Sequence, residues 1–400
     1  MKADPLEAAD GLEALDETLL MGPGPSPVHP SVLRALCAPT VGHLDPRFLR
    51  IMDQVAGWLA QVFGAGDGRA LVISGTGTAG MEASVLNLVE PGDRVVAVVA
   101  GFFGERLAEM CRRAGAEVQV VRVQWGRACE PAQLERALGE RGPVKLVAVV
   151  HAETSTGVLQ PLRPLAELAR RYGALLLVDA VTSLGGVPVE VEAVGIDACY
   201  SCSQKCLGCP PGLAPLFLGS RAVLAMERRR APRPTWYFDL DLLARYWGPQ
   251  RQYHHTAPIN MMYALHRALR RVLDEGLAER YRRHRLAARA LWAGLEALGL
   301  RLVVDEVSLR APTLTTVWVP DGVDEAAVRR RLLEEYAIEI GGGLGDWRGR
   351  VWRIGTMGES ARVRWVAALL GALAQILSEQ GWRAEGGQAV AAALAAAGSA

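Results

Sequence analysis

Short apolar runs that do not alternate with polar residues recur between residues 70 and 218. They read ALVISG, RVVAVVA, EVQVVRV, KLVAVVHAE, ALLLVDA, DACYSC and APLFLG. Between several of them the apolar positions follow a helical period, at residues 104–114, 131–138 and 164–172. Strands that are apolar on both sides and separated by helices are typical of a parallel sheet covered on both faces. The pattern predicts an α/β domain with a mainly parallel, seven-stranded sheet and flanking helices.

The pattern changes near residue 260. A helical region at residues 260–298 is broken near Gly276, and the runs RLVVD, LTTVWVP and VWRIGT follow, with helical patterns at residues 324–335 and 360–380. This mixture predicts a smaller α+β domain. We expect an N-terminal arm at residues 1–20, a large domain at 21–275 and a small domain at 276–382. Residues 383–400 are Ala-rich and form either a weak helix or a frayed tail.

Composition and charge exclude several classes of function. The 400 residues carry a net charge of +1 with acids and bases interspersed, so no basic patch for nucleic acid is expected. No apolar stretch is long enough to cross a membrane, and the N-terminal sequence MKADPLEAAD does not resemble a signal peptide. We expect a cytoplasmic protein that binds neither nucleic acid nor a membrane.

Asp179 and Lys205 are the first candidates for chemistry. Asp179 ends the run ALLLVDA, and Lys205 follows 26 residues later in the stretch SCSQKCLGC. A carboxylate at a strand end can keep the nitrogen of pyridoxal phosphate protonated, and a lysine on the next turn can form the Schiff base and carry a proton. A buried pair of this kind can also be structural, so its meaning depends on the other motifs.

The segment Gly75–Gly80 reads GTGTAG and matches the G-x-G-x-x-G pattern of dinucleotide-binding proteins. An NAD-dependent dehydrogenase is therefore an alternative. The next run ends in Ala100 and Gly101, without the acidic residue that would bind a ribose. Amides at a helix N-terminus, with threonine hydroxyls added, bind any phosphate, including that of pyridoxal phosphate. Together with Asp179 and Lys205, the segment favours the pyridoxal cofactor.

Two further segments belong to this interpretation. The segment His151–Gly157 ends an apolar strand with polar groups, where ligands bind in open α/β sheets, although such a loop is often a turn and cap. Arg353 lies on a predicted strand of the small domain, between apolar residues. A buried arginine needs an anionic partner, which is either a substrate carboxylate or a structural ion pair.

We expect no metal site. Cys199, Cys202, Cys206 and Cys209 have a spacing that could be drawn as a zinc or iron–sulfur site, but free buried cysteines are the better interpretation. Adjacent histidines such as those of Tyr253-His254-His255-Thr256 point apart on a strand or loop, and no third ligand lies at a suitable spacing.

These motifs together resemble the class V (fold type I) pyridoxal-phosphate-dependent aminotransferases, and within them the alanine–glyoxylate and serine–pyruvate group. The resemblance covers about residues 20 to 380. It is carried by the segments 21–25, 74–77, 154–161, 178–179, 183–186, 203–205, 253–256, 341–345 and 353–355.

The resemblance implies a role for each candidate residue. Lys205 would carry the cofactor and Asp179 would pair with its ring nitrogen, while Arg353 would bind the substrate carboxylate. The chain would be a homodimer in which Tyr253 and Thr256 reach the phosphate of the neighbouring subunit. The remaining implied cofactor contacts are Thr76, Gly77, Thr78 and Gln204 at the phosphate, Thr154 at the phenolic oxygen, and Phe103 and Val181 at the ring faces.

The chain departs from the family pattern at two of these positions. Thr78 stands where a histidine is familiar, and Phe103 stands where the animal enzyme has a tryptophan. The expected reaction is transamination between alanine or serine and glyoxylate or pyruvate, since no second arginine is evident for a dicarboxylate.

A ureidoglycine–glyoxylate aminotransferase is the alternative within the family. In that subgroup a glutamine would stand at His43 and an asparagine at Asn260, so the sequence matches one of the two marks. A cysteine desulfurase is excluded, because no cysteine follows Cys209.

Overall fold

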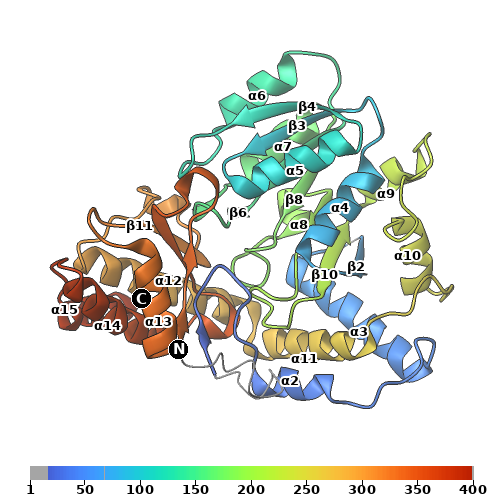
Figure 1. Ribbon diagram of the computed structural model, residues 1–400. Coiled ribbons are helices and arrows are strands. Elements are labelled where there is room, and N and C mark those ends of the chain that lie inside the picture. The colour runs from blue at the N-terminus through green and yellow to red at the C-terminus, as the bar shows by residue number, and fades with distance from the viewer. Residues whose placement is uncertain (1–16, 67, 399–400) are drawn as a thin grey trace, which may run out of the picture.

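The computed structural model describes residues 17–66 and 68–398, and its large domain is built on one central sheet (Figure 1). Six strands are parallel, and β10 runs antiparallel to both of its neighbours. The seven-stranded, mainly parallel sheet predicted from the sequence is confirmed. The strands follow one another in the order β2 (Arg69–Ser74), β10 (Leu213–Leu218), β9 (Ala198–Tyr200), β8 (Leu175–Asp179), β5 (Leu146–Val150), β3 (Arg94–Val99) and β4 (Glu117–Arg122).

Both faces of the central strands β3, β5 and β8 are buried, which is why these strands show no polar alternation. In β5, Val147 and Val149 face one apolar core, whereas Leu146 and Ala148 face another. The first core is closed by α3 (Pro46–Phe63), α6 (Pro131–Gly139), α7 (Arg163–Arg171) and α11 (Ile259–Glu275). The second core is closed by α4 (Gly77–Leu88), α5 (Phe102–Arg113), α9 (Ser220–Glu227) and α10 (Leu240–Trp247).

The small domain, drawn in orange and red in Figure 1, combines a short sheet with a group of helices. Its antiparallel sheet has the order β11 (Leu314–Trp318), β14 (Val351–Gly355) and β13 (Gly341–Gly342). The helices are α12 (Leu277–Ala297), α13 (Glu325–Tyr336), α14 (Val363–Glu379) and α15 (Gly386–Gly398).

The apolar run RLVVD at residues 301–305 does not form a strand. Leu302 forms a single bridge to Val317 of β11, and the chain then turns into a short 3-10 helix at Val307–Leu309. The two hydrogen bonds around the bridge join Val303 to Thr316 and Trp318 to Arg301. The segment therefore extends the sheet by one pairing. Leu302 belongs to the core of the small domain, and Val303 and Val304 are also buried.

The two ends of the described chain both belong to the small domain. Leu19–Leu20 (β1) pairs in parallel with Ile338–Glu339 (β12), while residues 1–16 of the expected N-terminal arm lie outside the described residues. At the other end α15 buries Ala389 and Ala393 against α12 and α14, so the Ala-rich segment is a packed helix. Among residues 17–66 and 68–398, no helix combines the length and the apolar character needed to cross a membrane.

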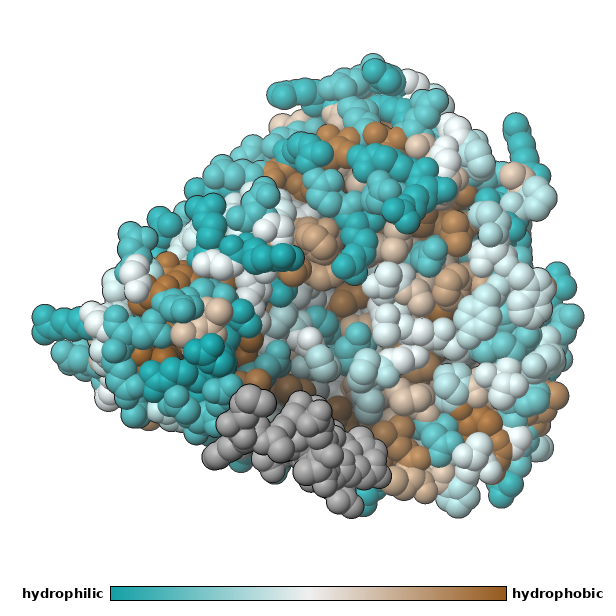
Figure 2. Space-filling model, viewed as in Figure 1, coloured by the Kyte–Doolittle hydropathy of each residue, from teal (hydrophilic) through white to brown (hydrophobic). Residues whose placement is uncertain are grey.

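The junction between the domains lies at Gly276, where the sequence pattern placed a break. This glycine has φ +80° and ends α11, and its backbone also precedes the first turn of α12. The buried side of α11 faces the large sheet, and that of α12 faces the second core. Figure 2 shows the surface hollowed where the two domains meet.

Candidate active site

A cavity of about 240 Å³ lies at the edge where the parallel strands end. The predicted site residues line it, except for Tyr253, Thr256 and Arg353. The lining consists of Gly24, Pro25, Thr76, Gly77, Thr78, Met81, Phe103, Arg106, Val150, Thr154, Asp179, Val181, Gln204, Lys205 and Pro211. Because the carboxyl ends of parallel strands meet at one edge of a sheet, residues far apart in the sequence converge on one cavity.

Lys205 enters this cavity from a turn between β9 and β10. Its amine donates a hydrogen bond to the carbonyl of Pro23, and burial lowers the pKa of the amine. Gly24 passes so close that a Cβ there would lie 2.6 Å from Cδ of Lys205, and its φ of +114° also favours glycine. A buried amine with a lowered pKa is suited to act as a nucleophile and a base.

Asp179 ends β8 on the floor of the cavity. Its carboxylate accepts hydrogen bonds from the amide of Val181 at 2.8 Å and from the hydroxyl of Tyr200 at 2.9 Å. Burial raises the pKa of Asp179 to about 6. A buried carboxylate without a bonded cation is costly, and the pyridinium of pyridoxal phosphate supplies such a cation.

The sequence interpretation missed Tyr200. Asp179 and Tyr200 are directly paired in the β8–β9 ladder, which brings the tyrosine hydroxyl to the carboxylate. The run DACYSC contained the residue, but the register of two strands separated by a helix is not visible in one sequence.

The predicted phosphate site is the N-terminus of α4. Thr76 precedes the helix and makes no side-chain capping hydrogen bond. Gln204 also lines the cavity, where its side-chain NH2 group can donate to a phosphate; its buried Oε1 atom has no hydrogen-bond partner within the described residues. A Cβ on Gly77 would lie 2.8 Å from Val181, so a glycine is needed for this close approach. Unpaired amides at a helix N-terminus fit a phosphate, and the polar groups present therefore fit the cofactor.

The sheet topology excludes the dinucleotide alternative. The G-x-G-x-x-G segment follows β2, which is an edge strand with the antiparallel β10 as its partner in the sheet. In a dinucleotide fold the glycine-rich turn follows a central strand at the point where the strand order reverses. The glycine-rich segment here is therefore a phosphate loop of another fold.

Glu153 and Thr154 follow β5, where the short strand β6 (Ala152–Glu153) ends. The hydroxyls of Thr154 and Thr182 share a hydrogen bond of 2.5 Å beside the cavity. Glu153 is buried and accepts hydrogen bonds from Ser155 and from the amides of Phe103 and Gly104. This carboxylate lies in the polar segment 151–157 but was given no role of its own from the sequence; it fixes the first turn of α5 and with it the ring of Phe103 in the cavity wall.

Arg353 lies directly behind the lining residue Thr154. Its guanidinium donates to the carbonyl oxygen of Gly342 at 2.6 Å and to that of Thr154 at 3.3 Å. Burial lowers the pKa of Arg353 to about 10, and its side chain forms no ion pair with a carboxylate of the described chain. The structural ion pair that was the alternative is not formed there. A buried cation next to the cavity remains available for an anion.

A second arginine reaches the cavity, contrary to the sequence interpretation. Arg106 of α5 lines it, and its guanidinium donates to the hydroxyl of Thr78 at 3.3 Å. The group also lies over the ring of Phe103, 4.9 Å from its centroid. The residue was missed because it lies on the exposed side of a predicted helix, and only the packing of α5 beside α4 brings it to the phosphate loop.

The segment 253–256 lies away from the cavity of its own chain. Tyr253 and Thr256 are exposed, and the ring of Tyr253 packs 5.0 Å from that of His43. The expectation that the two histidines point apart is wrong. Their Nδ1 atoms lie 2.8 Å apart in a hydrogen bond, because the chain bends here and does not form a strand. His255 also reaches Ser74 at the end of β2.

The cysteines near Lys205 are free and fully buried, as expected. Burial raises the pKa of Cys202 to about 12 and that of Cys206 to about 11, so both thiols stay protonated and poorly reactive. Redox sensitivity of these two thiols is therefore not supported. Among the described residues, no three histidine, cysteine or acidic side chains are grouped so that they could hold a metal ion.

Comparisons with known proteins agree with this geometry. The family model "Aminotransferase class-V" matches residues 31–345. An (S)-ureidoglycine–glyoxylate transaminase of Bacillus subtilis is 39% identical over 393 residues, covering 94% of each chain. An alanine–glyoxylate aminotransferase of Drosophila melanogaster is 39% identical, covering 88% of this chain and 91% of that protein.

A solved structure extends the agreement to three dimensions. The alanine–glyoxylate aminotransferase of Nostoc sp. is 50% identical and superposes with a TM-score of 0.89, covering 94% of this chain and 98% of that one. The lysine, the carboxylate and the phosphate loop found here are the parts that a pyridoxal-phosphate enzyme requires. The chain belongs to the class V aminotransferases, which are pyridoxal-phosphate-dependent enzymes of fold type I.

Proposed function

We propose that the protein transfers the amino group of a small amino acid, alanine or serine, to glyoxylate or pyruvate. The observation that carries this proposal is Arg353, a buried arginine behind the cavity wall that has hydrogen bonds to two carbonyl groups and, within the described chain, no ion pair with a carboxylate. The planar guanidinium fits a substrate carboxylate. The small cavity and the relatives named above support the choice of a small donor.

Each residue of the site has a defined task in this reaction. Bound pyridoxal phosphate supplies the electron sink that stabilises the substrate carbanion. Lys205, as a neutral amine, removes the α-proton of the amino acid and later returns a proton. Asp179 keeps a proton on the ring nitrogen by holding a negative charge beside it. Tyr200 and the amide of Val181 hold that carboxylate in place.

The phosphate end and the ring faces are held by other parts of the chain. Gly77 and Thr78 present the start of α4, and Gln204 also lines the cavity, where its side-chain NH2 group can donate to the phosphate. Val181 and Phe103 both line the cavity and are the apolar side chains expected at the ring faces. Thr154 presents a hydroxyl that is already paired with Thr182.

Replacing Arg353 by alanine is expected to lower kcat/KM for every carboxylate substrate. Loss of one partner from a buried charged contact costs about 2–5 kcal/mol, which is roughly 30-fold to 5000-fold in kcat/KM. The visible absorption of the cofactor should stay unchanged. Arg350→Ala is the control, because this exposed arginine lies three residues away and stacks on Trp318. An unchanged kcat/KM in Arg353→Ala would remove Arg353 from the substrate site.

Ureidoglycine is the alternative donor, favoured by the Bacillus relative and by Asn260. The amide of Asn260 donates to the carbonyls of Leu36 and Ala38, and its oxygen accepts from Thr40. The side chain of Asn260 thus anchors residues 36–40 to the first turn of α11. In a comparison of alanine, serine and ureidoglycine with glyoxylate as acceptor, we expect alanine or serine to give the highest kcat/KM. A clear preference for ureidoglycine would reverse the assignment.

We further propose that the active enzyme is a homodimer with shared sites. Tyr253 and Thr256 are exposed and lie outside the cavity of their own chain, so they are free to reach the phosphate of a second copy. A site completed across subunits would make the dimer obligatory.

Mixing two inactive variants tests this sharing. When Lys205→Ala is refolded with the double variant Tyr253→Phe and Thr256→Ala, half of the dimers are mixed and each has one intact site. Activity should recover to about a quarter of the wild-type value if sites are shared in a two-fold dimer. Activity no higher than that of the separate variants would contradict shared sites.

A further inference from the structure

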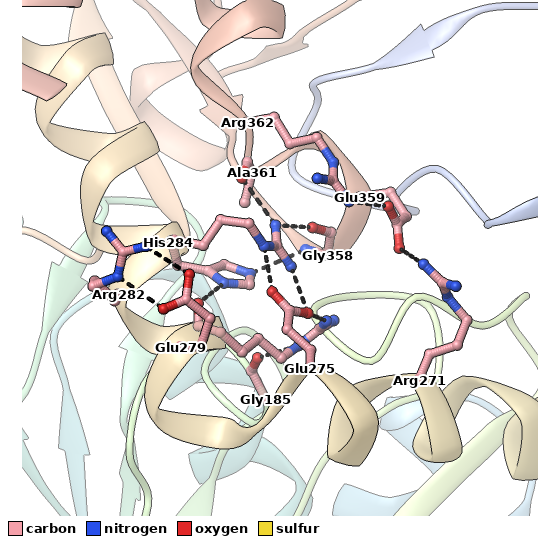
Figure 3. Close-up of polar contacts among 12 residues, drawn as sticks. Gly185, Arg271, Glu275, Glu279, Arg282, His284, Gly358, Glu359, Ala361 and Arg362 are labelled. Atoms are coloured by element: carbon pink, nitrogen blue, oxygen red, sulfur yellow. Dashed lines mark hydrogen bonds and ion pairs between the residues drawn. The ribbon is translucent and has the colours of Figure 1, made fainter. Parts of the chain in front are cut away.

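A cluster of four polar side chains, three of them charged, joins the two domains beside the turn that carries Lys205. We call Glu275, Arg280, Arg283 and His284 the junction cluster. Glu275 ends α11, and the other three lie on the first turns of α12, on the far side of Gly276. Figure 3 shows these helix ends facing Gly185 of the large domain and Gly358 of the small domain.

Arg280 binds two loops of the large domain at once. Its side chain is 4% exposed. Its guanidinium donates to the carbonyl of Gly185 at 2.9 Å, to the carbonyl of Cys206, and to the carboxylate of Glu275 at 2.6 Å. Gly185 belongs to the loop that follows Asp179, and Cys206 is the residue after Lys205. One buried side chain therefore links the loops that carry both groups of the active site.

The two loops are already in close contact, so their relative position is sharply defined. A Cβ on Gly186 would lie 2.6 Å from the sulfur of Cys206. The carbonyl of Lys205 accepts hydrogen bonds from Ser26 at 2.7 Å and from the amide of Gly208 at 3.0 Å. Successive carbonyls of the lysine turn are thus held by Ser26 and Arg280. Cys206 fits here because it is small and apolar.

The other half of the junction cluster binds the small domain. Arg283 donates to the carbonyls of Gly358 and Ala361 and to Glu275. Burial lowers the pKa of His284 to about 3, so its ring is neutral. Its Nδ1 donates to the carbonyl of Arg280 at 2.8 Å, and its Nε2 accepts from the amide of Gly358 at 3.1 Å. Gly358 follows β14, the strand that carries Arg353.

Glu275 is the shared element of these contacts. Its two oxygens bind the arginine that holds the lysine turn and the arginine that holds the segment after β14. We infer that Arg280, oriented by Glu275, is a positioning residue for transamination, which holds the Lys205 turn in register with Asp179 and with the segment that follows Arg353. The inference rests on the aminotransferase activity and not on the identity of the amino donor.

Arginine suits this task better than lysine. Its rigid fork reaches three acceptors in one plane, whereas a single ammonium group cannot satisfy the same set with the same geometry. A misplacement of about 1 Å in a catalytic group can reduce a rate by about a hundredfold. Arg280→Met is therefore expected to slow amino transfer while donor binding changes little.

The test compares Arg280→Met, Arg280→Lys and Glu275→Gln with the control Arg282→Gln. Arg282 lies on the same helix but is 54% exposed, and its ion pair is with Glu279. Three quantities are measured with any amino donor that the wild type uses. They are kcat and KM, the pH midpoint of the visible cofactor band without substrate, and deuterium exchange of the peptide 203–209 in the cofactor-free protein.

For Arg280→Met we expect kcat to fall about tenfold to a hundredfold, with KM changing less than about threefold. The pH midpoint should move by at least about half a unit, because the nitrogen of Lys205 changes place relative to the charged and titratable groups around it. Those groups are Asp179, Cys202, Cys206 and Arg353, and they are unaltered in these variants. Deuterium exchange of the peptide 203–209 should rise in Arg280→Met. Arg280→Lys should show a smaller change in each of the three quantities than Arg280→Met. Arg282→Gln should resemble the wild type.

Two results would overturn the inference. One is a folded Arg280→Met protein with wild-type kcat, midpoint and exchange. The other is an equal loss in Arg282→Gln, which would indicate general weakening of α12. If Arg280→Met does not fold, Glu275→Gln decides, since it keeps both arginines and removes one charge. Wild-type values of kcat, midpoint and exchange in Glu275→Gln would then contradict the inference. Because the midpoint and the exchange are measured without substrate, an error in the proposed donor would leave both of them unaffected.

Discussion

Replacing Lys205 by alanine is expected to abolish the visible absorption of the bound cofactor and to lower kcat by at least about a hundredfold and up to about ten-thousandfold. The size follows from the loss of a positioned general base, which contributes about 10²- to 10⁴-fold, together with loss of the covalent attachment. The Lys205 amine is buried against Pro23, and within residues 17–66 and 68–398 no other lysine lines the cavity. No lysine of this part of the chain can therefore replace it.

Lys145→Ala is the matched control for this substitution. Lys145 precedes β5 and does not line the cavity. Its removal should leave the absorption spectrum and kcat unchanged. If Lys205→Ala kept a wild-type spectrum and rate, the assignment of the cofactor-bearing lysine would be wrong.

Replacing Asp179 by asparagine is expected to lower kcat by about a hundredfold to a thousandfold, the effect of removing one preorganised electrostatic group from an active site. Asparagine keeps the shape of the side chain but removes the charge that holds a proton on the cofactor nitrogen. Without that proton the ring withdraws electrons poorly, so the α-proton is harder to remove. Binding of the cofactor through its phosphate and Lys205 should persist. Rapid-mixing absorption of a single amino-transfer step, with and without a deuterium label at the α-carbon, measures the effect.

Asp197→Asn provides the comparison. Asp197 is also buried, but it binds Arg221 and the amide of Leu176 outside the cavity. Its loss should reduce stability and leave the deuterium isotope effect unchanged. A wild-type rate in Asp179→Asn would mean that the carboxylate does not act on the ring nitrogen.

The fold could be predicted in large part because its signals are local. Most runs of the main sheet are apolar on both sides, and Gly276 separates two long helical patterns. The segment RLVVD carried the same kind of signal but formed one bridge, since strand formation also depends on a neighbour with free edge groups. A single sequence does not contain that information.

The distinction between local sequence signals and contacts with distant segments applies to the site as well. Lys205 and Asp179 could be identified because each follows a recognisable strand, and the structure places both on the cavity. Tyr200 depends on strand register, Arg106 on the packing of two helices, and Arg280 on the approach of two domains. Each of these arises from contacts between segments distant in the sequence, so local patterns could not reveal them.

The central claim is that Lys205 carries pyridoxal phosphate, and the composition of the chain makes it unusually easy to test. The sequence contains lysine only at positions 2, 145 and 205. The protein with bound cofactor is reduced with borohydride, digested and analysed by mass spectrometry. The account predicts one phosphopyridoxyl group on the peptide that contains Lys205, and none on it when the amino donor is added before reduction. A label on Lys2 or Lys145 instead, or no label on a protein that binds the cofactor, would contradict the account.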